Sequence, residues 1–362
     1  MTEAPPLQQL DRTYVRVGRR RLSYFAGCDY FRLASHPKVL RALGDGLKRF
    51  GLNVAASRLT TGNHALYAEL EKSLMNFFHR ESAVLVANGY MTNLIVAQAL
   101  AGSFSQVLID EKAHSSLMDA TRFFKCPVIK FKHRDPADLQ RAISRTGKNT
   151  KPILFADGIF SHDGSLTPLK SYLKLFPADA MMMVDDAHGA GTLGRTGQGS
   201  IELEAIPRRR VIQTITLSKA FGVYGGAILG PRALREKIVT RSSMFGGSTP
   251  LPLPLANAAL ASINILRTDK KLRQRLVQNV AHVKSKLRES GWEIAPPPSP
   301  IVAIFPKSLR QAEKLKERCL ANGVYPSFIN YHGGPRDGYF RFAISSEHSR
   351  RQLDSLIAAL IS

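Results

Sequence analysis

The sequence predicts an α/β fold in which helices cover a large, mostly parallel sheet, with a small α+β unit after it. Two observations lead to this prediction. Between residues 64 and 230, short apolar runs with β character alternate with segments of helical periodicity, as in parallel strands joined by helices. After residue 250 the pattern changes to a long basic helix followed by a few short elements. A chain of 362 residues, 44% hydrophobic, can bury one large core and a smaller second one.

Seven apolar runs are expected to form the strands of the large sheet, because continuous apolar stretches are typical of strands buried on both faces. They are "SAVLVAN" (82–88), "QVLID" (106–110), "CPVIKFK" (126–132), "PILFAD" (152–157), "AMMMVDD" (180–186), "VIQTITLS" (211–218) and "GGAILG" (225–230). Helices are expected between several of them. Before the first run, Leu66, Leu70, Leu74 and Phe78 recur on one face of a predicted helix.

The C-terminal third predicts a second unit that begins after "STPLPLPL" (248–255). Its long basic helix keeps apolar residues at helical spacing, at Leu272, Leu276, Val280, Val283 and Leu287. "IVAIFP", a helix at about 308–322, "YFRFAIS" and a terminal helix then alternate. We therefore divide the chain into an N-terminal segment (1–45), a large domain (46–250) and a small C-terminal domain (251–362).

Charge and targeting signals limit the possible partners. The chain has 51 Lys and Arg against 28 Asp and Glu, a net charge of +23, so nucleic acid and acidic partners must be considered. The basic residues are scattered and lack aromatic platforms, which favours a generally basic surface, or attraction of an acidic acyl carrier, over a nucleic-acid module. No signal peptide or membrane span is evident, and Cys28, Cys126 and Cys319 match no metal spacing. We expect a soluble, cytoplasmic protein with reduced thiols.

The stretch "MMMVDDAHGAG" (181–191) is the first candidate for chemistry. In open α/β sheets, ligands bind beyond the carboxyl ends of the strands, where Asp185 and His188 are expected. A buried carboxylate needs a partner, and a protonated pyridine nitrogen is one that fits. Two alternatives remain: the acids Asp185 and Asp186 cap the next turn, or they bind a metal. Metal binding is disfavoured because no second histidine or further carboxylate stands at ligand spacing.

A single lysine, Lys219, follows the next apolar run in "TITLSKAFGVYGG" (214–226). A lysine near a cofactor pyridinium has a lowered ammonium pKa and can form a Schiff base with an aldehyde. A lone lysine after a strand is more often solvated, so Lys219 gains weight only together with Asp185 and His188. "ANGY" (87–90) precedes a helix predicted to begin near Met91, whose N-terminus suits a phosphate; an ordinary turn is the alternative.

Together these motifs resemble the α-oxoamine synthases of the fold-type I (aspartate aminotransferase-like) pyridoxal-phosphate enzymes. The resemblance covers nearly the whole chain and includes "DYFRLASHPKVL", "SRLTTGN", "ANGYMTN", "DEKAHSSLMDA", "DGIFSHDGSLTPL", "VDDAHGAGTLG", "TLSKAFGVYGG" and "FRFAISSEHS". It implies a seven-stranded large sheet, pyridoxal 5'-phosphate (PLP) as cofactor and a homodimer. It also implies an acyltransferase that condenses an amino acid with an acyl thioester, on coenzyme A or an acyl carrier protein, and releases CO2 and an α-aminoketone.

The resemblance also implies a role for each matching residue. Lys219 is the Schiff-base lysine and general base, Asp185 the pyridinium partner, and His114 the residue that stacks on the ring. The other cofactor contacts are Gly89, Tyr90 and Thr216 on the phosphate side, Ser161 and His188 at the phenolic oxygen, and Thr249 toward a neighbouring subunit. Arg341 is expected to bind the amino-acid carboxylate, with Phe340 and Phe342 on the opposite face. His332 is expected to contact substrate, and no metal ligand is expected.

Among the members, the compact length and "SRLTTGN" favour the 8-amino-7-oxononanoate synthases, which use L-alanine and a pimeloyl thioester in biotin biosynthesis. The alternatives are a glycine C-acetyltransferase, a 5-aminolevulinate synthase, a serine palmitoyltransferase-like enzyme or a carrier-dependent synthase of a secondary pathway. "SFINYHGGP" (327–335) departs from the usual pattern on the acyl side and leaves the substrate open. From a different class, a non-catalytic nucleic-acid-binding or regulatory protein is the alternative, which the retained lysine and Asp185 disfavour.

Overall fold

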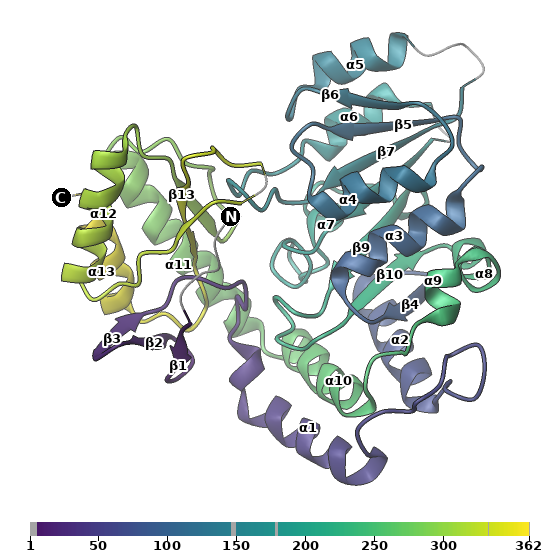
Figure 1. Cartoon of the computed structure of the whole chain (residues 1–362), viewed down its shortest axis with the longest axis horizontal. Coiled ribbons are helices and arrows are strands. Elements are labelled where there is room, and N and C mark those ends of the chain that lie inside the picture. Colours follow the sequence, from purple (N-terminus) through teal and green to yellow (C-terminus); the bar gives the residue numbers. More distant parts are fainter. Residues whose placement is uncertain (1–5, 146–149, 178–179, 332, 362) are drawn as a thin grey trace.

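The computed structural model describes residues 6–145, 150–177, 180–331 and 333–361. It has two lobes: a large one built on a wide sheet and a smaller one formed by the C-terminal elements (Figure 1). Within the described residues, no helix has the length and apolar character required to cross a bilayer.

The large sheet has seven strands in the order β4-β10-β9-β8-β7-β5-β6, and only β10 runs antiparallel to its neighbours. The seven apolar runs of the sequence are these strands, so the predicted sheet is confirmed. They are β4 (Ser82–Val86), β5 (Gln106–Asp110), β6 (Val128–Phe131), β7 (Pro152–Asp157), β8 (Met181–Asp185), β9 (Val211–Thr216) and β10 (Gly226–Gly230).

Helices cover both faces of this sheet, which explains why its strands are mostly apolar. On one face lie α3 (Gly89–Leu100), α4 (Ser115–Ala120), α8 (Arg232–Arg241) and α9 (Ser243–Gly247). The other is covered by α2 (Ala65–Phe78), α5 (Pro136–Ser144), α6 (Leu169–Leu175), α7 (Ser200–Leu203) and α10 (Leu253–Thr268). The expected stripe on α2 is buried as predicted.

The parallel register brings the ends of β7, β8 and β9 to one edge of the sheet. Asp157 of β7 lies opposite Asp185 of β8, which in turn lies opposite Thr214 of β9. Residues that follow these strands, including His188 and Lys219, therefore emerge at the same edge, where α/β folds place their ligands.

The smaller lobe contains α11 (Lys270–Glu289), α12 (Leu309–Ala321), α13 (Arg350–Ile361) and an antiparallel sheet in the order β11-β13-β12. Its strands are β11 (Ile301–Ile304), β12 (Phe328–Ile329) and β13 (Tyr339–Ala343). The apolar stripe predicted on the long basic helix is buried in α11. In β13, Phe340 and Phe342 are fully buried while Arg341 is half-buried, which confirms the predicted alternation.

The N-terminal strands β1 (Gln8–Gln9), β2 (Tyr14–Val17) and β3 (Arg20–Ser23) lie beside the smaller lobe (Figure 1). The backbone of Ser23 donates to Gly323 and accepts from Tyr325, which ties this segment to the C-terminal unit. Helix α1 (Pro37–Phe50) instead packs on α10; a Cβ at Gly46 would lie 2.8 Å from the Cα of Pro254. The three-part division of the chain stays a prediction.

Candidate active site

A chain of three polar side chains lies at the carboxyl edge of the large sheet. The Nζ atom of Lys219, three residues beyond β9, is 2.9 Å from Nε2 of His188. The Nδ1 atom of His188 is 2.6 Å from the hydroxyl of Tyr30, a residue close to the N-terminus. Tyr30 and His188 are both buried, so the imidazole is held between the phenol and the amine.

The surroundings of these three side chains favour the uncharged forms of Lys219 and His188. Burial lowers the pKa of Lys219, and the positive charge of Arg341 adds to the decrease while Cys28 and Asp185 oppose it. Burial also lowers the pKa of His188 well below its ordinary value, with further decreases from Lys219 and Arg341. A neutral imidazole carries one N–H, so His188 donates at one ring nitrogen and accepts at the other. His188 can therefore donate to one of its two neighbours, Tyr30 or Lys219, while it accepts from the other.

Asp185 ends β8 with its carboxylate held in a fixed position. One oxygen accepts a 2.6 Å hydrogen bond from the side-chain amide of Asn93, and the other accepts from the backbone N–H of Ala187. Asn93 belongs to α3, and its carbonyl oxygen accepts from the hydroxyl of Thr214 on β9. This network of buried groups fixes Asp185 in the floor of the site.

A second carboxyl, Asp157, lies beside Asp185 at the end of β7. Burial and the negative charge of Asp185 raise the pKa of Asp157 well above its ordinary value. One of its oxygens accepts a 3.0 Å hydrogen bond from the backbone N–H of His114. Asp157 therefore holds the segment that carries His114, and its neutral form avoids a repulsion between two adjacent charges.

His114 is the N-cap of α4, with its ring fixed from both sides. Its Nδ1 accepts from the backbone N–H of Ser116 and lies 2.7 Å from the hydroxyl of the same residue. Its Nε2 is 3.0 Å from the hydroxyl of Tyr331, which comes from the smaller lobe. Residues of both lobes thus orient this imidazole.

The phosphate-side residues meet where α3 begins. A Cβ at Gly89 would lie 2.7 Å from the Cβ of Thr216, so only glycine permits this approach of α3 to β9. Helix α3 begins at Gly89, two residues before the predicted start near Met91. Asn88 is its N-cap, because the Asn88 side chain accepts a hydrogen bond from the backbone N–H of Met91. Tyr90 is 40% exposed at the rim, and its hydroxyl donates to Asp119.

Arg341 reaches the site from β13. Its guanidinium donates to the backbone carbonyl of Ser161 at 3.1 Å and lies 5.2 Å from the centre of the Tyr331 ring. Ser161 is buried in the loop after β7. Arg341 and Tyr331 of the smaller lobe therefore meet Ser161 of the large lobe at this site.

The structure does not bring Thr249 into this centre. Thr249 is exposed in the loop between α9 and α10, where it lines a small hollow with Val86 and Met91. His332 lies outside the described residues.

The neighbouring acid Asp186 has a different task from Asp185. One of its carboxylate oxygens accepts from the N–H of Ser200 and from the side chain of Gln213. Asp186 is fully buried, and burial raises its pKa to about 7. A Cβ at Gly189 or Gly199 would overlap this carboxyl, which explains both glycines. Asp186 thus fixes the loop that carries His188.

Sequence reasoning assigned no role to five residues of the site: Cys28, Tyr30, Asn93, Asp157 and Tyr331. Cys28 was expected only to be a packed thiol; it is free and half-buried, next to the hydroxyl of Tyr30, and it adds to the rise that burial causes in the pKa of that hydroxyl. Tyr30 and Asn93 lie inside motifs that supported the family resemblance, and this position in a motif was the only sign in the sequence that they belong to the site.

Comparisons with known proteins agree with this geometry. The family model described as aminotransferase class I and II matches residues 29–360. The chain belongs to this family. It is 34% identical over 347 residues to the 8-amino-7-oxononanoate synthase of Thioalkalivibrio sulfidiphilus, covering 95% of this chain and 88% of that protein. The synthase of the same name from Symbiobacterium thermophilum is 32% identical, covering 98% and 91%.

Solved structures show the same architecture. Serine palmitoyltransferase from S. paucimobilis, solved with a bound PLP-myriocin aldimine, superposes with a TM-score of 0.91 at 24% identity, covering 98% of this chain and 90% of that one. The fold-type I transferase fold expected from the sequence is confirmed.

Proposed function

We propose that this protein is a PLP-dependent α-oxoamine synthase that joins an amino acid to an acyl thioester with loss of CO2, and specifically an 8-amino-7-oxononanoate synthase using L-alanine and a pimeloyl thioester. The observation that carries the proposal is the contact between the buried amine of Lys219 and the neutral imidazole of His188, beside Asp185. The relatives named above supply the specific reaction.

The residues present fit PLP. Lys219 offers an amine of lowered pKa for the aldehyde, and the carboxyl of Asp185 is oriented by Asn93 to accept from a protonated ring nitrogen. The beginning of α3, which approaches Thr216 closely at Gly89, offers free N–H groups to a phosphate. Amine, carboxylate and helix N-terminus match the three polar parts of the cofactor.

Further residues of the chain would hold the cofactor in place. His114, oriented by Ser116 and Tyr331, is proposed to stack on the ring. Ser161 and His188 are proposed to contact the phenolic oxygen, and Tyr90 the phosphate. Thr249, exposed in its loop, is proposed to reach the cofactor of a second subunit, which requires a homodimer.

When bound, PLP supplies an electron sink for negative charge at the α-carbon of the amino acid. The protein then has to bind the substrate and move a proton. Arg341 presents a planar guanidinium suited to the amino-acid carboxylate, beside the ring of Tyr331. Nζ of Lys219, whose pKa is lowered, is proposed as the base that takes the α-proton. His114 is proposed to polarise the incoming carbonyl.

The remaining parts of the proposal concern partners and location. The acyl group arrives as a thioester of coenzyme A or of an acyl carrier protein, and the net charge of +23 favours an acidic carrier during encounter. We propose a cytoplasmic location, as for an enzyme of biotin biosynthesis. His332 is proposed to contact the substrate.

The test is the visible absorption of the purified, cofactor-loaded protein, titrated in turn with L-alanine, glycine and L-serine. We expect a saturable change with L-alanine, and no lysine-bound cofactor band in Lys219→Ala. A control variant, Lys316→Ala, removes a lysine of the surface pair with Glu313 and should keep the band. A change with glycine or L-serine alone would assign the protein to another α-oxoamine synthase. A wild type without any band would overturn the catalytic proposal.

A further inference from the structure

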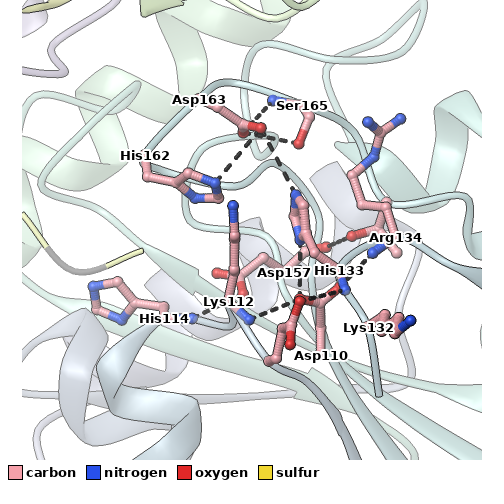
Figure 2. Close-up of polar contacts among 12 residues, drawn as sticks. Asp110, Lys112, His114, Lys132, His133, Arg134, Asp157, His162, Asp163 and Ser165 are labelled. Atoms are coloured by element: carbon pink, nitrogen blue, oxygen red, sulfur yellow. Dashed lines mark hydrogen bonds and ion pairs between the residues drawn. The ribbon is translucent and has the colours of Figure 1, made fainter. Parts of the chain in front are cut away.

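A cluster of two histidines and an aspartate lies at the ends of β6 and β7, apart from Lys219. His133 follows β6, and His162 with Asp163 follows β7. Nε2 of His162 is 3.5 Å from Oδ2 of Asp163, and Nε2 of His133 is 3.7 Å from the same oxygen. One ligand atom from each residue lies within 4.8 Å of the other two. Figure 2 shows both imidazoles pointing toward this carboxylate.

The groups around the cluster hold its ligand atoms in this orientation. Nδ1 of His133 is 3.0 Å from a carboxylate oxygen of Asp110, as in the carboxylate–histidine pairs that orient metal-binding imidazoles. The Oδ1 atom of Asp163 accepts from both the N–H and the hydroxyl of Ser165. These contacts occupy the far side of each group, so Oδ2 of Asp163 and Nε2 of His133 face one another.

The two imidazole nitrogens that face Asp163 lack hydrogen-bond partners among the described residues. Nε2 of His133 and Nε2 of His162 are both buried and unpartnered. Their distances to Oδ2 exceed the length of a hydrogen bond, but they suit ligands that share one ion. The His162 side chain is only 3% exposed, so water cannot easily compensate its nitrogen.

Some charges near the cluster favour a bound cation and others oppose it. Burial lowers the pKa of His162 to about 4, which keeps it neutral, the form that binds metals. The carboxylates of Asp110 and Asp163 attract positive charge and raise the pKa of His133 although burial opposes them. Lys112 points toward the cluster (Figure 2) and repels a cation.

We propose that His133, His162 and Asp163 bind a first-row divalent transition-metal ion, with Zn²⁺ as the first candidate and water as the fourth ligand. Two histidines, one carboxylate and a water are a known tetrahedral zinc set. No metal ligand was expected from the sequence, because His133 is separated along the chain from His162 and Asp163 and the three residues match no local ligand spacing.

The position of the cluster indicates a structural task for the ion. The loop that carries His162 and Asp163 packs against β11 of the smaller lobe, since a Cβ at Gly164 would lie 2.8 Å from the Cβ of Ile301. A Cβ at Gly333 would lie 3.1 Å from Nδ1 of His162. The ion would thus stiffen the junction between the two lobes. This proposal does not depend on the proposed function.

The experiment measures Zn²⁺ binding by calorimetry on untagged, cofactor-loaded protein without amino acid, with Co²⁺ absorption as a report of the ligand set. We compare the wild type with His162→Met and Asp163→Asn. Losing a residue that merely orients a ligand costs about 10- to 100-fold in metal affinity, so losing a ligand should cost at least about 100-fold. The matched control is His282→Gln, which alters a surface histidine–aspartate pair with Asp354.

The proposal predicts one Zn²⁺ per chain, lost in both cluster variants and kept in His282→Gln. It also predicts that Zn²⁺ raises the melting temperature of the wild type but not of His162→Met, and that Lys112→Met binds Zn²⁺ more tightly. Absence of wild-type binding, or equal binding by His162→Met, would overturn it. Because the readouts are metal binding and stability, a failure of the proposed catalysis would not affect them.

Discussion

The buried carboxyl of Asp186 offers a quantitative test of the electrostatics beside the active site. Its pKa of about 7 compares with an ordinary value of 3.8, a difference of about 3 units caused chiefly by burial. The perturbation is Asp186→Asn, which removes the charge, keeps the shape and retains an oxygen for the N–H of Ser200. The substitution therefore imitates the protonated acid that the folded protein prefers.

The sign and size of the effect follow from linkage. Below about pH 4 the carboxyl is protonated in both states and contributes nothing to the pH dependence. Between about pH 4 and 7 the unfolded chain loses this proton while the folded protein keeps it, so the wild type loses stability as pH rises. At 1.36 kcal/mol per unit, the total cost above pH 7 is about 4 kcal/mol. Asp186→Asn avoids this cost.

The assay is urea unfolding of wild type and variant from pH 4.5 to 8.5. The unfolding free energy of Asp186→Asn minus that of the wild type should rise by about 3 to 4 kcal/mol across this range. Asp354→Asn is the control whose difference should stay nearly constant over this range, because hydrogen bonding to His282 lowers the pKa of this exposed carboxyl and so places its titration at more acidic pH. A difference for Asp186→Asn that does not change with pH would refute the reasoning.

Three further predictions concern the hydrogen bonds of the site. Tyr30→Phe and Tyr67→Phe each remove a buried hydroxyl that makes a 2.6 Å hydrogen bond. Each substitution should lower the unfolding free energy by about 1–3 kcal/mol. Only Tyr30→Phe should change the pH titration of the bound cofactor's absorbance, because only Tyr30 contacts His188. Asn93→Leu should weaken PLP binding about 10- to 100-fold in a fluorescence titration, because Asp185 loses a charge-assisted bond. Arg341→Lys should weaken amino-acid binding about 10- to 100-fold by spectral titration while PLP affinity stays unchanged.

The sheet was predictable because local sequence decides it. Strands covered by helices on both faces must be apolar along their whole length, so β7 and β8 appear as uninterrupted runs. The alternation around Arg341 was also predictable from local sequence, because successive side chains of a strand point to opposite faces. The start of α3 was predicted two residues late, because a cap depends on where the side chain of Asn88 turns.

The parts of the site that could not be predicted depend on contacts between distant segments. Tyr30 meets His188 across 158 positions, and Asn93 meets Asp185 across 92. Apart from the motifs that contain them, nothing local distinguishes this tyrosine from one in the core, or this asparagine from a polar residue in a helix turn. Their roles follow only from the folded arrangement, in which the N-terminal segment and α3 converge on the ends of β8 and β9.

Three buried carboxyls at the carboxyl edge show how neighbouring positions acquire different tasks. Asp185 and Asp157 face the site from adjacent strands, and the rise in the pKa of Asp157 keeps a proton there, so the pair does not carry two adjacent charges. Asp186, one residue beyond β8, turns the other way and binds the backbone of the loop after His188. Because consecutive residues fix the loop and the floor of the site, Nε2 of His188 is held 2.9 Å from Nζ of Lys219. Burial at this edge, more than any single charge, lowers the pKa of both His188 and Lys219, so that a neutral imidazole faces an amine of lowered pKa.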